Sequence, residues 1–457
     1  MKEYDLVIIG AGPGGYPAGL IAGLKGLRTL VIEKDKLGGI CLNRGCIPTK
    51  FFLKASELWE EIRTAEDLGI EVPSRELNYT FLNNKKEKLL SSLRSGLEFL
   101  FRKRGVEVAF GQGRIISENE VLILSPEKRV VKASKMIIAS GSRPVELEGL
   151  EFDHKYILSS DSILELNHIP QSLLVVGGGV IGVEFAHHFS RLGTKVYIVE
   201  IMDRILPNME TEVSKTLEAV FKKSGIQIFT SRKVEKINKT EDGNEVILDN
   251  GISINVDKVL VAVSRKANTD GLWENITIET QQGFVVVDDY LRTNMKNIYA
   301  IGDVKPGFML AHSASYEAKI AVKNILGENV TPDYSAVPLC IYTQPEIAAV
   351  GLKEEEAREK GYDLKIANFP FQALGKARII SKTEGFVKLI ADKKSGLILG
   401  AHLIGPYVTE LISELCLAVK FKIPYWGLEG VVHPHPTISE AIQEAIEILN
   451  ESPMHTI

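Results

Sequence analysis

Cysteine and tryptophan are scarce in this chain, which has four Cys and three Trp among 457 residues. The cysteines, at positions 41, 46, 340 and 416, are too few and too unevenly spaced for a disulfide scaffold. No apolar run reaches the roughly 18 residues that a membrane-spanning helix needs. The N-terminus also lacks the charged segment, apolar stretch and cleavage site of a signal peptide. We therefore expect a soluble cytoplasmic protein.

A surplus of basic charge is also absent, because 54 Lys plus Arg stand against 59 Asp plus Glu. This balance argues against a nucleic-acid-binding protein, which normally carries a basic stripe. A dense Lys/Arg cluster between Lys85 and Arg104 alternates with apolar residues at helical spacing. We expect an amphipathic helix there, with a solvated charged face. The chain length corresponds to about three domains.

The most informative feature that is present is a motif that occurs twice. In its first copy, an apolar strand at Asp5–Ile9 is followed by a glycine-rich turn and a helical stretch. The glycines are Gly10, Gly12 and Gly15, and a second apolar strand ends on Glu33, 18 positions after the last of them. Such a turn lets the backbone approach a pyrophosphate, to which the helix N-terminus presents free N–H groups.

The second copy begins with an apolar strand at Leu173–Val176. Its glycines are Gly177, Gly179 and Gly182, and the next strand ends on Glu200, again 18 positions after the last glycine. Strand, turn, helix and acid together are far more specific than the glycines alone, so we predict two dinucleotide sites. Each acid can accept hydrogen bonds from ribose hydroxyls. A carboxylate at the second site repels a 2′-phosphate and so favours NAD over NADP.

Two cysteines, Cys41 and Cys46, lie in the segment CLNRGCIPTK. Residues five apart on an ideal helix differ by about 140° in projection and do not share a face. A disulfide between them therefore requires a distorted start of a helix, which Gly38, Gly39 and Gly45 permit. An intracellular bonded pair would be catalytic or redox-sensing. The spacing alone leaves two reduced cysteines as an equally good interpretation.

Further segments follow these motifs in order along the chain, namely ASGSRP, VAVSRKANTDGL, NIYAIGDV and HPHPTISEA. With them, the sequence resembles the pyridine nucleotide–disulfide oxidoreductase family over essentially its whole length. It is most similar to the members that oxidise dihydrolipoamide. The resemblance implies an α/β fold with two Rossmann-like dinucleotide-binding domains, one for FAD and one for NAD, and a C-terminal α+β dimerisation domain.

The resemblance also suggests where the domains begin and end. We expect the FAD-binding domain at residues 1–145 and again at 268–331, interrupted by the NAD-binding domain at 146–267. The dimerisation domain is expected at 332–457, and a linker at Gly327–Pro338 that is rich in Pro, Asn and Asp marks this boundary.

Roles for the residues around the cysteines come from the same resemblance. Cys41 would exchange with the substrate, and Cys46 would lie against the flavin as the charge-transfer thiolate. Lys50 would approach the flavin N5 side, with Glu184 as its ion-pair partner.

Other site residues lie farther along the chain. By the resemblance, Gly141 and Asp303 would contact FAD, and His435 would act as the acid–base group. Imidazole titrates near neutral pH, so it can take a thiol proton, while Glu440 holds its other nitrogen. We treat the neighbouring His433 as supporting. In this family the histidine comes from the other subunit, so we expect an obligate homodimer.

The expected activity is oxidation of protein-bound dihydrolipoamide by NAD+. No lipoyl-bearing domain precedes Met1, so the lipoyl group is expected on another protein, either an acyltransferase core or a glycine-cleavage carrier. Glutathione reductase is the nearest alternative, and Arg204, close to Glu200, is a mild signal for the NADP that it would favour. A flavoprotein that only binds NAD is a different class, against which the intact dithiol argues.

Some residues depart from the family pattern or go beyond it. Arg44 lies between the two cysteines where we expect Val, and its charge either favours the thiolates or points to solvent. Ser264 stands where similar segments carry Gly. The tail helix is acidic and is expected to have a solvated face; its acids are Glu440, Glu444, Glu447 and Glu451.

Overall fold

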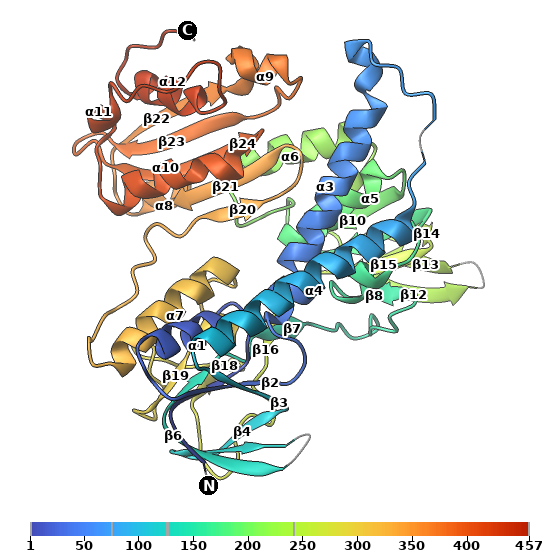
Figure 1. The fold of residues 1–457 in the computed structure, drawn as a ribbon. Coiled ribbons are helices and arrows are strands. Elements are labelled where there is room, and N and C mark those ends of the chain that lie inside the picture. Colours follow the sequence, from blue (N-terminus) through green and yellow to red (C-terminus); the bar gives the residue numbers. More distant parts are fainter. Residues whose placement is uncertain (1, 75, 125–127, 241–242, 456–457) are drawn as a thin grey trace.

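The computed structural model describes residues 2–74, 76–124, 128–240 and 243–455. The chain forms three bodies, each built around one main sheet (Figure 1). The N-terminal body lies at the bottom of the view, the second body at the right and the C-terminal body at the top. Within the described ranges, no helix combines the length and the apolar character needed to span a membrane.

The first body contains a seven-stranded sheet. Its strands are β1 (Lys2–Ile9), β2 (Thr29–Glu33), β3 (Glu107–Phe110), β4 (Gly113–Ser117), β5 (Glu120–Ile123), β6 (Arg129–Ile138) and β19 (Ile298–Ala300). The central strands are apolar and buried, as expected for a parallel sheet covered on both faces. Because β19 pairs with β6, the chain returns to this sheet after it has built the second body.

The helices of the first body are α1 (Gly15–Leu24), α2 (Gly39–Arg44), α3 (Cys46–Arg63), α4 (Tyr79–Lys103) and α7 (Ala311–Ile325), with short 3-10 turns at Ala65–Leu68 and Gly302–Val304. Helix α1 packs against α7. Helices α3 and α4 extend away from the sheet, past the second body (Figure 1).

The second body contains a five-stranded parallel sheet in the order β11-β10-β9-β15-β8. Its elements are β8 (Ile157–Leu158), β9 (Ser172–Val176), α5 (Val180–Arg191), β10 (Lys195–Val199), α6 (Thr211–Lys223), β11 (Gln227–Phe229) and β15 (Lys258–Val261), with a 3-10 turn at Ser162–Glu165. An antiparallel sheet of β12 (Val234–Thr240), β13 (Gly243–Leu248) and β14 (Ser253–Val256) lies beside it. Two further short pairs are β7 (Ser142–Pro144) with β16 (Arg265–Ala267) and β17 (Thr280–Gln281) with β18 (Phe284–Val285).

The third body contains a five-stranded antiparallel sheet in the order β20-β21-β24-β23-β22. Its strands are β20 (Leu339–Ile341), β21 (Glu346–Gly351), β22 (Leu364–Pro370), β23 (Phe386–Asp392) and β24 (Ile398–Gly405). Its helices are α8 (Glu354–Glu359), α9 (Gly375–Ile379), α10 (Val408–Lys420), α11 (Tyr425–Leu428) and α12 (Glu440–Leu449), with a 3-10 turn at Phe371–Ala373. Helices α10 and α12 pack on the sheet. The predicted fold class is confirmed.

The Lys/Arg cluster lies on α4, as its helical spacing predicts. Most of its charged residues face solvent, but the side chain of Lys86 is only 2% exposed. Its Nζ donates to the carbonyl oxygen of Leu164, at 2.7 Å. The prediction of a solvated face is wrong at this position because α4 lies against the second body there.

The acidic tail helix, α12, also differs from the prediction. Glu444 is buried, and one of its oxygens lies 2.7 Å from Nδ1 of His455. Glu440 is partly buried and bonds to His435. The expected solvated acidic face is therefore wrong for Glu440 and Glu444, because each of them bonds to a histidine of the same body.

Candidate functional site

The two glycine turns have the same geometry. Gly10 and Gly177 have φ of +103° and +105°, in the left-handed region that favours glycine. A Cβ on Gly15 would lie 1.8 Å from the carbonyl oxygen of Gly10, and one on Gly182 would lie 2.0 Å from that of Gly177. Each first and third glycine is thus required by the backbone of its own turn.

The middle glycines are different. A Cβ on Gly179, the residue that precedes α5, would meet no atom of the described chain within 4 Å. One on Gly12 would be in ordinary contact, 3.7 Å from Gly39. Protein packing therefore leaves space over these residues at a helix N-terminus, where backbone N–H groups attract phosphate. The turns fit the pyrophosphates of FAD and NAD.

The two acids that follow the glycine turns, Glu33 and Glu200, bond to the backbone of these turns. Glu33 accepts hydrogen bonds from the N–H groups of Ala11 and Asp35, at 2.8 and 2.9 Å. Glu200 repeats the pattern with Gly178, at 2.6 Å, and with the N–H two residues after itself, at 2.8 Å. Both acids are buried, and burial raises the pKa of Glu33. Sequence reasoning assigned these carboxylates to ribose and missed their bonds to the turns.

The two cysteines lie at a break between helices. Helix α2 ends at Arg44 and α3 begins at Cys46, with Gly45 between them at φ −143° and ψ −113°. This is the distortion that the sequence requires for Cys41 and Cys46 to approach. Both are free thiols in the structure, and each sulfur is the largest influence on the pKa of the other.

The electrostatics of the pair are asymmetric. The interaction with the Cys46 side chain, followed by burial, raises the pKa of Cys41. The interaction with the Cys41 side chain, with help from the Lys50 ammonium, lowers the pKa of Cys46 to about 7, against the effect of burial. Near neutral pH, Cys46 is therefore the more readily ionised of the two sulfurs, and Cys41 stays a neutral thiol.

The predicted Lys50–Glu184 ion pair is present. Nζ of Lys50 lies 2.8 Å from both carboxylate oxygens of Glu184, whose side chain is 4% exposed. The pair joins α3 of the first body to α5 of the second. The N–H of Tyr342 also donates to Glu184, at 3.0 Å, and its ring lies 4.7 Å from Nζ of Lys50. Burial raises the pKa of Tyr342 to about 12; no sequence motif indicated this residue.

Asp303 lies in the 3-10 turn that follows β19. Oγ of Ser142 donates to it at 2.6 Å and accepts a hydrogen bond from Arg265 at 2.8 Å. Gly141, just before Ser142, has φ of +69° and open space where a Cβ would be. Glu317 on α7 accepts from the N–H of Gly302, at 2.7 Å. The two predicted flavin residues, Asp303 and Gly141, are thus held near each other.

The predicted histidine–glutamate pair is present in the third body. Nδ1 of His435 lies 2.8 Å from Glu440, which also accepts from the N–H of Thr437 at 2.8 Å. Burial raises the pKa of Glu440, but these two hydrogen bonds outweigh it and leave the pKa lowered. The His435 side chain is 79% exposed, so its other nitrogen is free to face a second molecule. His433 has its own acid, Glu414, which raises the pKa of His433.

Two arginines whose roles the sequence did not decide are bonded to other residues of the chain. Arg44 forms an ion pair with Asp35. Arg204 donates to Asp203 and to the carbonyl oxygen of Pro207, both at 3.1 Å. The cation that lowers the pKa of Cys46 is Lys50.

Comparison with protein families identifies the chain. Residues 4–318 match the model described as pyridine nucleotide-disulphide oxidoreductase, and residues 337–446 match the dimerisation domain of the same family. The chain belongs to the pyridine nucleotide-disulphide oxidoreductase family. It is an oxidoreductase that uses FAD and NAD, and its dimerisation domain supports a homodimer.

Individual relatives match over nearly the whole chain. A dihydrolipoyl dehydrogenase of Bacillus subtilis (strain 168) is 42% identical, with 97% of each chain covered. One of Chlamydia pneumoniae is 39% identical, over 99% of this chain and 98% of that protein. Among solved structures, LpdA from Mycobacterium tuberculosis has a TM-score of 0.92 at 27% identity, covering 98% of this chain and 100% of that one. The HOCl-induced flavoprotein disulfide reductase RclA from Escherichia coli, as its Cu(II) complex, has a TM-score of 0.89 at 28% identity, with the same coverage.

The Lys50 charge gives a prediction about thiolate formation. In the reduced protein, a titration of thiolate absorbance near 240 nm should have a midpoint close to 7. In Lys50→Met the midpoint should rise, because the cation that favours the Cys46 thiolate is lost. Lys54→Met, which removes an exposed lysine four residues along the same helix, should leave the midpoint unchanged. Equal midpoints in all three proteins would refute this account.

The open space at Gly179 gives a second prediction. Gly179→Ala should leave the thermal unfolding temperature and FAD content unchanged but weaken NAD+ binding at least roughly tenfold, or about 1.4 kcal/mol. The reason is that the added methyl group meets no protein atom and occupies the approach of the pyrophosphate. Calorimetric titration of the holoprotein with NAD+ measures the effect. Gly96→Ala, at another open glycine on α4, is the control and should bind normally.

Proposed function

We propose that the protein oxidises the dihydrolipoyl group of a second protein with NAD+ as acceptor. The observation that carries the proposal is the Cys41–Cys46 pair, in which the pKa of Cys46 is lowered beside the partly buried Lys50–Glu184 ion pair. The relatives named dihydrolipoyl dehydrogenase over nearly full length support the same substrate.

The reaction begins with the oxidised pair, joined as a Cys41–Cys46 disulfide. The partner subunit's His435 takes the proton of one dihydrolipoyl thiol, and Glu440 of the same subunit holds the imidazole so that Nε2 is the accepting atom. The lipoyl thiolate attacks Sγ of Cys41, the disulfide breaks, and Cys46 leaves as a thiolate. Its pKa of about 7 makes Cys46 the better leaving group of the two.

The second lipoyl thiol then completes the exchange. It loses its proton to water and attacks the lipoyl sulfur that is bonded to Cys41, which forms the lipoyl disulfide and releases Cys41 to take up the proton held by the partner subunit's His435. The substrate has lost two electrons and the Cys41–Cys46 pair has gained them. Bound FAD and NAD+ supply the onward transfer of this electron pair as a hydride. Lys50 keeps the Cys46 sulfur anionic for that transfer.

The exposed position of His435 fits a substrate carried on another protein. A lipoyl arm on an acyltransferase core or on a glycine-cleavage carrier can reach a side chain that is 79% exposed in the single chain. The four cysteines of the chain are too few for a disulfide scaffold, which fits a reducing compartment, so the proposal includes a cytoplasmic location.

Substitution of the attacked cysteine tests the proposal. Cys41→Ser should retain FAD and lose NADH-dependent lipoamide reduction by about 10³-fold or more, because the mixed disulfide cannot form. Cys340→Ser, which removes a cysteine of the third body, should turn over normally. Assays with NADPH and oxidised glutathione test the alternative function, that of a glutathione reductase. Turnover only with that pair, or normal lipoamide turnover by Cys41→Ser, would overturn the assignment.

Subunit complementation tests whether His435 acts across the dimer. Cys41→Ser and His435→Gln homodimers should each be strongly impaired. Co-expression of the two chains should restore about a quarter of wild-type turnover, because about half of the dimers are mixed and each mixed dimer has one intact site. If His435 served the cysteines of its own chain, mixing would restore nothing.

A further inference from the structure

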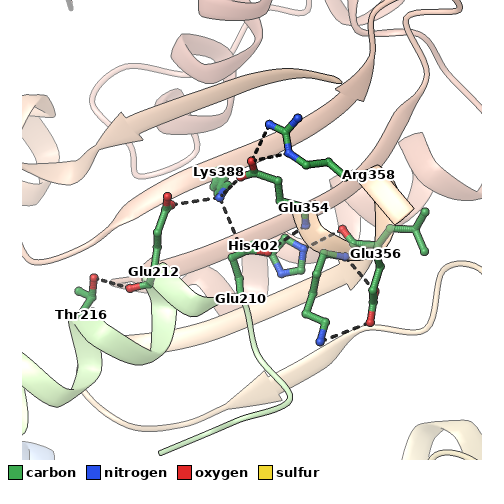
Figure 2. Close-up of polar contacts among 10 residues, drawn as sticks. Glu210, Glu212, Thr216, Glu354, Glu356, Arg358, Lys388 and His402 are labelled. Carbon is green, nitrogen blue, oxygen red and sulfur yellow. Dashed lines mark hydrogen bonds and ion pairs between the residues drawn. The ribbon is translucent and has the colours of Figure 1, made fainter. Parts of the chain in front are cut away.

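A buried lysine joins the third body to the second. Lys388 lies on β23, and its side chain is 2% exposed. Its Nζ lies 2.8 Å from Glu354 of its own body, and 3.1 and 3.2 Å from Glu210 and Glu212 of the second body (Figure 2). Burial alone lowers the pKa of Lys388, but the carboxylates outweigh it and leave the pKa raised, so the ammonium stays charged.

Glu210 depends on the third body more than the other two acids do. It is buried, one oxygen accepts from Lys388, and the other accepts from the N–H of Glu354 at 3.1 Å. Glu354 has a second cation, because Arg358 donates to it at 2.8 and 3.1 Å. The side chain of Glu212 is 51% exposed to water. Among the described residues, Lys388 is the cation bonded to Glu210, so its loss leaves this carboxylate buried without a counter-charge.

The segment that leads to Glu210 runs back over the second glycine turn. The N–H of Leu206 donates to the carbonyl oxygen of Gly178, at 2.9 Å. Ile205 is fully buried and fills the space where a Cβ of Gly178 would be, at 2.8 Å. Oγ of Ser214, on α6, holds the Leu206 carbonyl oxygen at 3.0 Å. Residues 200–210 thus begin at Glu200, which bonds to the second glycine turn, and then cover that turn. They end at Glu210, which is bonded to Lys388.

We propose that Lys388 is a positioning residue for NAD: through Glu210 it holds residues 200–210 against the second glycine turn and so maintains the shape of the dinucleotide site. The proposal rests on NAD occupying the second turn and does not require lipoamide as substrate. It makes the dimerisation body a support of the nucleotide site that acts through residues 200–210. His402, beside the cluster, donates through Nε2 to the Leu352 carbonyl oxygen at 2.9 Å, and burial lowers its pKa, so it adds no competing charge.

Two carboxylates of the same cluster provide a matched test. Glu210→Gln and Glu212→Gln each remove one negative charge from Lys388, but only Glu210 ends the segment that covers the turn. Calorimetric titration of each holoprotein with NAD+ should show Kd raised at least about fivefold in Glu210→Gln, the lower end of usual coupling between sites. In Glu212→Gln the Kd should stay within about twofold of wild type. FAD content should be unchanged in both.

Substitution of the lysine itself tests the same coupling from the other side. Lys388→Met should raise the Kd for NAD+ as Glu210→Gln does, and the double variant should be no worse than either single variant, because both break one connection. In turnover assays the KM for NAD+ should rise while the KM for dihydrolipoamide stays constant. Lys388→Arg should restore much of the NAD+ affinity.

A merely structural role predicts a different set of results. It would lower the thermal unfolding temperature of Lys388→Met and Glu210→Gln and leave the Kd for NAD+ at the wild-type value, which would overturn the proposal. If Lys388→Met does not fold, Glu210→Gln decides, since its amide can still accept from Glu354 N–H. Because the Kd is measured directly, a wild-type protein inactive with lipoamide would defeat the proposed function and leave this inference standing.

Discussion

The break between α2 and α3 at Gly45 is the constraint on which the chemistry of this protein depends. A continuous helix would place Cys41 and Cys46 on different faces. The break lets the two side chains interact, which lowers the pKa of Cys46 and raises the pKa of Cys41. The Lys50 ammonium, one turn farther along α3, then favours the thiolate at Cys46. The pair thereby has one sulfur, Cys46, that leaves readily as a thiolate, and another, Cys41, that takes up a proton on release.

Two ion pairs with buried glutamates link the second body to the first body and to the third. Lys50 of the first body reaches Glu184 on α5, and Lys388 of the third body reaches Glu210 before α6. In both cases a lysine from a neighbouring body supplies the charge for a buried glutamate of the second body. Such pairs contribute little net stability, since desolvation offsets the attraction, but they penalise any other geometry strongly. Their effect is to fix the NAD-binding body relative to the thiols and to the dimerisation body.

Local patterns in the chain were sufficient to predict a large part of this arrangement. The glycine turns, their acids and the break at Gly45 depend on residues close together in sequence, where glycine conformations and strand periodicity decide the structure. The resemblance to a family, and not a local pattern, indicates Glu184 and Glu440 as the partners of Lys50 and His435. Where the sequence pattern was misleading, at Lys86 and Glu444, a charged residue of an amphipathic helix was buried by another element of the fold.

The sequence by itself determined the two dinucleotide turns, because each is encoded by a short run of residues with special backbone properties. The roles of the two cysteines and of the histidine–glutamate pair came from the resemblance to a family. Only the tertiary structure decided that Tyr342 borders the Lys50–Glu184 pair, that Glu33 and Glu200 bond to their own turns, and that Lys388 contacts Glu210. These contacts join residues from 22 to 178 positions apart. No local propensity specifies them, since they arise only when packed sheets bring distant segments together.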